Sequence, residues 1–328
     1  MSKLITRRGA VALSVAAPLI ATGASAQAPY PSKTVRIIVP FPPGQAADIF
    51  ARLMAERLTD IWKQQVIVDN KGGGGGIPGV EAGKAATPDG YTLLIATSGT
   101  FGVNPSLYAD LPYKPLVDFK PITNIIRGPL VIVAHPSFPA STVAELIELA
   151  RKEPGKHSYA SAGPGTAQHL SMELFKLMTK LDIVHIPYKG SGPAMADLLG
   201  GHVKLMMDST ASSLSAIRDG RIKALGVTTA KRVPAPLDKV PSIGETVPGY
   251  DSAGWSGLVA PAKTPDEIVN KVNTDMVALL RDPAVLRQFE ERATLADPLT
   301  PAQFAAFIAK DMATWAEVVK ATGTKPGN

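Results

Sequence analysis

Apolar and polar positions along most of the chain follow two alternating periods. Short β-branched runs such as 35–39 are followed by segments whose apolar residues recur every three or four positions, as Ile49, Leu53 and Leu58 do within 46–61. The first pattern is typical of strands and the second of helices. The same alternation predicts strands at 66–68, 92–96, 130–134, 157–161, 183–186, 203–207 and 222–228, and helices at 78–85, 141–152, 166–179, 193–199 and 212–218. We therefore expect an α/β fold with a mostly parallel sheet and right-handed crossovers.

The alternation relaxes twice into proline-rich chain, at 112–129 and at 234–248. Beyond the second stretch, the pattern predicts one strand at 254–260 and three helices at 265–280, 283–292 and 301–321. Two separate α/β sheets therefore explain the two interruptions of the pattern better than one continuous sheet does. A length of 328 residues is enough for two domains.

Residues 1–26 have the pattern of an export signal. A basic start precedes a weakly apolar stretch at 10–21, which is shorter than the ~20 residues that span a bilayer, and an Ala-Ser-Ala cleavage site follows at 24–26. The pair Arg7 and Arg8 leaves both the general and the twin-arginine export routes open. A frayed N-terminal helix is the alternative. Since no later run of ~18 uncharged apolar residues occurs, we expect the exported protein to be soluble.

Composition narrows the classes of function. Hydrophobic residues make up 45% of the chain and charged residues 19%, so a large core is expected and a disordered chain is excluded. The net charge of +6 falls to +3 without residues 1–26, which hold three basic and no acidic residues. This charge is too small to indicate a nucleic-acid partner. Cysteine is absent, which excludes disulfides, thiolate catalysis and cysteine–zinc sites.

The reactive residues that remain show no catalytic or metal-binding pattern. The five histidines form no i, i+4 pair and no His-Glu-x-x-His motif. No Gly-x-Ser-x-Gly nucleophile motif occurs either. We therefore expect no cofactor, no metal site and no enzyme.

Three loops follow predicted strands and could hold a ligand: 40–45, 97–100 and 161–166. In open α/β sheets, ligands bind just beyond the carboxyl ends of strands. Glycine lets backbone N–H groups approach a ligand, and a helix N-terminus adds partial positive charge. Ordinary turn chemistry is the alternative for any one loop, but three at one sheet edge favour an anion site without arginine.

The glycine run at 72–76 belongs to a formal dinucleotide pattern, Gly74-x-Gly76-x-x-Gly79. Pro78 lies inside the match, and the acidic residue expected about 20 positions later is missing from a following strand. A flexible surface turn or a loop at a cleft edge is therefore favoured over nucleotide binding.

Four single residues have two interpretations each. His169 lies one turn into a helix after the third loop and could reach a bound anion or be structural. Asp208 ends a strand and could pair with a ligand ammonium or cap the next helix. Tyr188 could line a cleft or satisfy a local backbone group. Trp255 is favoured as core or hinge packing.

Several motifs together match one family. The matching stretches are 39–44 with Asp48, 51–52, 69–70 before the glycine run, 88–94, 104–108, 159–161, 165–166, 169–170, 187–190, 197–201, 241–242 with Glu245, and 249–250. On these residues the chain resembles the Bug-type periplasmic solute receptors of the tripartite tricarboxylate transporter family. The resemblance covers essentially all of the chain.

The resemblance implies a type II periplasmic-binding-protein fold, whose two α/β lobes close on a small organic acid. Lobe 1 would comprise 27–128 and 250–328, and lobe 2 would comprise 129–249. The family binds di- and tricarboxylates, some amino acids and aromatic acids in the periplasm, and delivers them to membrane permease subunits. The ligand-binding residues that the resemblance implies here are Phe41, Gly44, Gln45, Ser98, Gly163, Gly165, Thr166, Ala167 and His169, with Asp208 on the distal side.

Two departures from the family pattern bear on the ligand. Gln45 stands where the family usually has a second glycine, and Phe101 stands where it often has histidine. Together with Phe41, these residues predict a more apolar cleft and a ligand with a substantial carbon skeleton, such as a longer dicarboxylate or an aromatic acid. A sensor subunit presenting the same ligand to a membrane receptor remains an alternative to a transport receptor, and an enzyme on small acids is the less favoured one.

Overall fold

The computed structural model describes residues 30–326, so the predicted export signal at 1–26 lies outside the described residues. The strands are β1 Val35–Val39, β2 Val66–Asn70, β3 Thr92–Thr97, β4 Phe119–Ala134, β5 Ser158–Ser161, β6 Val184–Pro187, β7 Leu205–Ser209, β8 Lys223–Val227, β9 Ala253–Pro261 and β10 Leu295–Ala296. The α-helices are α1 Ala46–Trp62, α2 Ile77–Lys84, α3 Asn104–Leu107, α4 Pro115–Asp118, α5 Val143–Lys152, α6 Ala167–Thr179, α7 Ser191–Leu199, α8 Thr210–Arg218, α9 Asp266–Leu279, α10 Pro283–Glu290 and α11 Pro301–Thr322. Short helical turns add η1 Gly74–Gly76, η2 Ser98–Val103 and η3 Ile243–Glu245.

The strands form one hydrogen-bonded path in the order β2-β1-β3-β9-β4-β7-β5-β6, with β8 and β10 both pairing with β4. The outer pairs β1–β2, β1–β3, β5–β6 and β5–β7 are parallel. The central pairs β3–β9, β4–β9 and β4–β7 are antiparallel. The mostly parallel sheet predicted from the strand–helix alternation is therefore wrong for the centre, where two long strands run in opposite directions.

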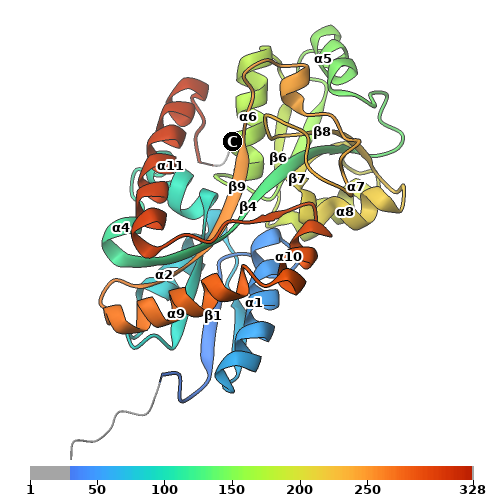
Figure 1. The fold of residues 1–328 in the computed structure, drawn as a ribbon. Coiled ribbons are helices and arrows are strands. Elements are labelled where there is room, and N and C mark those ends of the chain that lie inside the picture. The colour runs from blue at the N-terminus through green and yellow to red at the C-terminus, as the bar shows by residue number, and fades with distance from the viewer. Residues whose placement is uncertain (1–29, 327–328) are drawn as a thin grey trace, which may run out of the picture.

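β4 joins the two halves that the sequence predicts as separate sheets. Its first part pairs with β9, and its second part, from Leu130 onward, pairs with β7 and β8. Sixteen residues rising ~3.3 Å each are long enough to serve both halves. Figure 1 shows β4 and β9 side by side, running between the lower and upper parts of the molecule.

The proline-rich stretch 112–129, predicted as a break, instead contains the first part of β4. Pro121 and Pro129 both lie within this strand, and its pairing with β9 shifts register between Pro121 and Thr123 and again between Asn124 and Ile126. Proline is tolerated in sheets at such irregularities, because its missing N–H is then not needed by the ladder. Composition alone therefore misassigns this segment.

Each half buries its own core. In the first, apolar residues of β1 and α1 pack with the C-terminal helices, and the rings of Phe50 and Phe289 lie 4.5 Å apart. In the second, Ile132, Tyr159 and Phe175 pack together from β4, β5 and α6. The C-terminal helices α9 and α10 thus lie beside α1 (Figure 1), which closes the first half with the last part of the chain.

Candidate ligand-binding site

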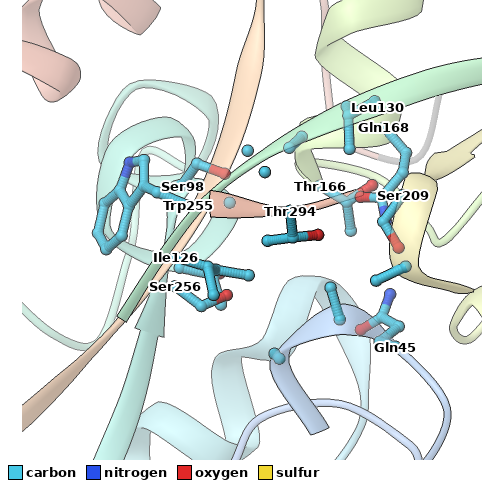
Figure 2. A pocket seen from close by; sticks show the side chains of 18 of the residues that line it. Gln45, Ser98, Ile126, Leu130, Thr166, Gln168, Ser209, Trp255, Ser256 and Thr294 are labelled. Carbon is cyan, nitrogen blue, oxygen red and sulfur yellow. The ribbon is translucent and has the colours of Figure 1, made fainter. Parts of the chain in front are cut away.

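A pocket with about 540 Å³ of space free of protein atoms lies at the meeting point of the two halves (Figure 2). The turns after β1, β3, β5 and β7 line it, together with parts of β4 and β9. The lining residues are Phe41, Gln45, Ala46, Ala47, Thr97, Ser98, Gly99, Ile126, Gly128, Pro129, Leu130, Thr166, Ala167, Gln168, Ser209, Thr210, Ala211, Gly254, Trp255, Ser256 and Thr294.

Three helices begin at this pocket. Residues 45–47 start α1, 166–168 start α6 and 209–211 start α8, and all nine line the pocket. The first N–H groups of a helix have no acceptor within the helix and lie at the positive end of its dipole. None of the lining residues, all from the described part of the chain, is charged. The pocket is therefore suited to an anion held by backbone N–H groups.

A buried carboxylate shapes the first loop. Asp48 is 3% exposed and accepts hydrogen bonds from Gly44 N at 3.0 Å and from Asn70 Nδ2 at 2.9 Å. Asn70 Nδ2 also donates to Phe41 O at 3.0 Å, and Arg52 pairs with Asp48 at 3.0 Å. These bonds fix the path of the chain from 41 to 45 at the start of α1.

Gln45 occupies the N-cap position of α1 without capping the helix. Its backbone is extended and its side chain makes no cap hydrogen bond, whereas Thr166 accepts from His169 N and Ser209 accepts from Ser212 N at the starts of α6 and α8. The buried Gln45 side chain lines the pocket instead. A neutral amide with both a donor and an acceptor thus stands at the start of α1.

The turn from 161 to 166 is braced from within the second half. Gly163 N donates to Ser161 Oγ at 3.0 Å, and Thr166 Oγ1 donates to Gly163 O at 2.7 Å. Ser161 Oγ also bonds His185 Nε2 at 2.7 Å. The turn therefore presents the start of α6 to the pocket in one conformation.

His169 is buried behind this turn. Gly165 N donates to its Nδ1 at 3.2 Å, and its ring stacks on that of His185. Burial, with smaller effects from His185 and Lys176, lowers the pKa of His169 to about 2. A neutral imidazole that accepts from Gly165 holds the turn, and its ring lines a separate hollow at the back of the turn.

Asp208 is also buried away from the pocket, at 0% exposure. Ser191 Oγ and Ser213 Oγ donate to its carboxylate at 2.6 and 2.8 Å, and the Gln168 side chain also bonds it. Burial raises the pKa of Asp208 despite these bonds. Ser209, the next residue, caps α8 and reaches the pocket in its place.

The structure brings five of the ten predicted site residues to the pocket wall, namely Phe41, Gln45, Ser98, Thr166 and Ala167. Gly44, Gly163 and Gly165 form the turns behind that wall, and His169 and Asp208 lie in the layer behind them. A contact of any of the ten with a ligand stays a prediction.

Close approaches outside the pocket lining join the two halves. A Cβ on Gly165, whose φ is +74°, would lie 2.6 Å from Asn104 Oδ1. Ser212 Oγ donates to Gly44 O at 3.1 Å. Glycine is required at 165 both by its positive φ and by this approach.

Sequence reasoning missed several lining residues. Ser209 and Thr210 had a local signal, because a serine directly after a strand and before a helix is a favoured N-cap. The lining residues from β4, β9 and the segment before β10 had no such local signal, because contacts between distant strands bring them to the pocket. They are Ile126, Pro129, Leu130, Ser256 and Thr294.

The prediction that Phe101 makes the cleft more apolar is wrong. Its side chain is fully buried in the core of the first half, where its ring lies 5.3 Å from Phe119 and 6.3 Å from Tyr113. It follows Ser98 in the helical turn η2, which directs position 101 inward. Phe41 does line the pocket.

The other two aromatic residues considered, Tyr188 and Trp255, each donate a hydrogen bond to an aspartate. Tyr188 Oη donates to Asp197 at 2.6 Å. Trp255 Nε1 donates to Asp311 at 2.7 Å, and Figure 2 shows its indole directed away from the pocket. Trp255 is therefore a packing residue that borders the pocket, as the sequence favoured.

The glycine run packs against the first loop. A Cβ on Gly72 would lie 2.8 Å from Pro42 Cδ, and one on Gly76 would lie 3.2 Å from Phe41 Cζ. This placement supports a loop at the cleft edge.

Within residues 30–326 no group of three or more His, Asp or Glu side chains is placed to hold a metal ion, and no helix there is long and apolar enough to cross a membrane.

Comparison with known proteins agrees with this architecture. Residues 50–324 match the family described as "Tripartite tricarboxylate transporter family receptor". Protein BugT of Bordetella pertussis is 36% identical over 298 residues, which cover 90% of this chain and 91% of that protein. Two solved structures are each 36% identical and cover 90% of this chain and 99% of theirs: the periplasmic binding protein BugD, with a TM-score of 0.85, and R. palustris Rpa4515 with adipate, with a TM-score of 0.88.

These similarities confirm the expected α/β fold of the two-lobed periplasmic solute-binding proteins. The family match covers both halves of the sheet and every turn that lines the pocket except the first. The chain belongs to the receptor family of the tripartite tricarboxylate transporters.

Proposed function

We propose that this protein is a periplasmic receptor that binds a small organic carboxylate between two lobes and delivers it to a membrane permease. The lobes are 27–128 with 250–328, and 129–249. The observation that carries the proposal is the start of three helices, α1, α6 and α8, at one pocket whose lining residues are all uncharged. Helix starts donate backbone hydrogen bonds to carboxylates, phosphates and sulfates alike, and the family match favours a carboxylate among these anions.

Ligand binding would favour the closed arrangement of the lobes. The starts of α6 and α8 come from the second lobe and that of α1 from the first, so a carboxylate between them bridges the two. The contacts of Gly165 with Asn104 and of Ser212 with Gly44 accompany this arrangement. A ligand that binds only the closed form shifts the population toward it, and the closed form is what a permease can recognise.

The wall of the pocket supports a ligand with an extended carbon skeleton. Phe41, Ile126 and Leu130 offer apolar surface, and covering it would contribute about 25 cal/mol per Å². The related Rpa4515 structure holds adipate, a dicarboxylate. Longer dicarboxylates and aromatic acids are therefore the classes to test first.

Thermal unfolding of the purified protein tests the proposal. The protein is unfolded and refolded to release any bound ligand, then heated with C3–C10 mono-, di- and tricarboxylates, aromatic acids and amino acids. A ligand at 100 times its dissociation constant adds about 2.7 kcal/mol, a shift of a few degrees. A shift with one class of acid supports the receptor function. No shift with any carboxylate overturns it.

A further inference from the structure

Two serines with little exposed surface line the pocket. Ser98 is 2% exposed and Ser256 is 5% exposed. Among residues 30–326 neither hydroxyl bonds another protein group, and neither oxygen is fully enclosed by protein atoms. A hydroxyl that faces a pocket in this way can donate to and accept from a bound molecule.

The two serines lie on the same side of the pocket. Ser256 on β9 is the register partner of Thr97 on β3, the residue just before Ser98. Figure 2 shows Ser98 and Ser256 on one side, whereas Gln45, Thr166, Gln168 and Ser209 lie on the opposite side. In this view the apolar Ile126 lies between the two serines, and Thr294 lies between the serines and the residues of the opposite side.

The polar side chains of α6 and α8 at the opposite end are already paired within the protein. Thr166 Oγ1 donates to Gly163 O, the Gln168 side chain bonds Asp208, and Ser209 Oγ bonds Ser212 Oγ at 2.7 Å. What remains there for a ligand is the backbone N–H groups of the helix starts and the Gln45 amide. That end suits a carboxylate.

The serine end suits an uncharged group. No cationic side chain lines the pocket, and the helical turn that begins at Ser98 has only six residues. A carboxylate placed there would lose its hydration in exchange for two hydroxyls, and a buried charge without a partner is costly. A hydroxyl or carbonyl oxygen is matched by serine hydroxyls, because each can donate and accept.

We infer that Ser98 and Ser256 form a second polar subsite, which takes an uncharged hydroxyl or carbonyl group at the end of the ligand remote from its carboxylate. The favoured ligand class is then a monocarboxylic acid with a distal hydroxyl or carbonyl group. This inference rests on the proposed carboxylate-receptor function and specifies its ligand.

Isothermal titration with matched acids tests the inference. At each chain length from C4 to C8, the refolded protein is titrated with three acids that differ only at the far end, for example hexanoate, 6-hydroxyhexanoate and adipate at C6. We expect the hydroxy acid to bind at least tenfold tighter than the other two at the best length. Tenfold corresponds to about 1.4 kcal/mol.

The double variant Ser98→Ala/Ser256→Ala is expected to bind the hydroxy acid and the methyl-ended acid equally. Ser171→Ala is the matched control, because Ser171 is a buried serine that bonds Ser252 outside the pocket, and it should keep the preference. If the dicarboxylate binds tightest, or the methyl-ended acid binds as well as the hydroxy acid, the inference is wrong and the receptor function stands. If none of the acids binds at any length, and the wider panel of carboxylates also gives no shift, the receptor function itself fails.

Discussion

The imidazole rings of His169 and His185 stack with their centroids 4.1 Å apart and their planes 13° from parallel. His169 Nδ1 accepts from Gly165 N, and His185 Nε2 bonds Ser161 Oγ. The two rings, from α6 and β6, therefore hold both ends of the turn that leads to the pocket. Since a proton on either ring would raise the cost of charging the other, this arrangement favours the neutral state of His169.

Removing the titration of His169 should reduce the acid sensitivity of folding. Its pKa is lowered from 6.5 to about 2, so below pH 6.5 the unfolded chain binds a proton that the folded protein does not. Stability from this group is therefore lost as the pH falls from 6.5, by at most ~1.4 kcal/mol per pH unit. In urea denaturation, His169→Asn should lose about 1–2 kcal/mol less than wild type between pH 7.5 and pH 5.

The control for this prediction is His202→Asn, which removes an exposed imidazole. The comparison separates an effect specific to the buried His169 from the general effect of replacing a histidine with asparagine. An unchanged pH dependence in His169→Asn would show that His169 takes up its proton in the folded protein.

Replacing Asp48 should loosen the first loop of the pocket. Asp48→Ala removes the acceptor for Gly44 N and Asn70 Nδ2 and leaves these donors without their partner. We expect a loss of about 2–4 kcal/mol in the free energy of unfolding, because hydrogen bonds to a buried charged group are among the strong ones. Ligand affinity should fall about tenfold or more, which titration of the refolded variant measures.

A suitable comparison for Asp48 is Asp266→Ala, which removes an exposed ion pair with Lys120. Such surface pairs contribute about 0–1 kcal/mol. Equal losses of stability in the two variants would contradict the bracing role of Asp48.

A side chain at position 165 should weaken ligand binding more than its backbone strain explains. Gly165→Ala forces a Cβ to within 2.6 Å of Asn104 Oδ1, across the two halves. Gly220→Ala meets a similar positive φ with no atom within 4 Å of the new Cβ. Each variant should lose about 1 kcal/mol of stability from strain alone, but only Gly165→Ala should also raise the ligand dissociation constant. Equal dissociation constants in the two variants would exclude this role for the contact.

Asp311 should destabilise the protein at high pH. Burial raises its pKa from 3.8 to about 6, so between these values the folded protein holds a proton that the unfolded chain releases. Stability is therefore lost as the pH rises from about 4 through 6. Asp311→Asn keeps an acceptor for Trp255 Nε1 and should be about 1–3 kcal/mol more stable than wild type at pH 8, with the gain vanishing near pH 4.

Chemical denaturation at pH 8 and pH 4 measures this difference. Asp238→Asn, at an exposed position, provides the comparison and should change stability by less than about 0.5 kcal/mol at either pH. A destabilised Asp311→Asn at pH 8 would show that the ionised carboxylate is the favoured form in the folded protein.

Much of the local structure was predictable from the sequence, but only five of the 21 residues that line the pocket were predicted as site residues. The β1–α1, β3–η2 and β5–α6 turns were recognised because a strand period, a glycine and a helix period follow one another along the chain. These signals depend only on neighbouring residues. They place Gln45, Ser98 and Thr166 at the ends of strands, where the pocket lies.

Contacts between distant segments decided the rest. The antiparallel register of β4 with β9 brings Ile126 opposite Ser256, residues 130 positions apart in number, and no periodicity encodes that pairing. The direction of the Asp208 side chain was likewise not predictable from the strand pattern. Its carboxylate turns toward Ser191 and Ser213, which donate its buried hydrogen bonds.

By itself, the sequence determined the order of most strands and helices, two of the three helix starts at the pocket, and the family. These follow from spacing and propensity over a few neighbouring residues. The tertiary structure decided that the sheet is mixed, that Phe101 faces the core and that Ser98 and Ser256 lie on the same side of the pocket. The physical reason is that strand register and the pairing of buried polar groups depend on partners far along the chain.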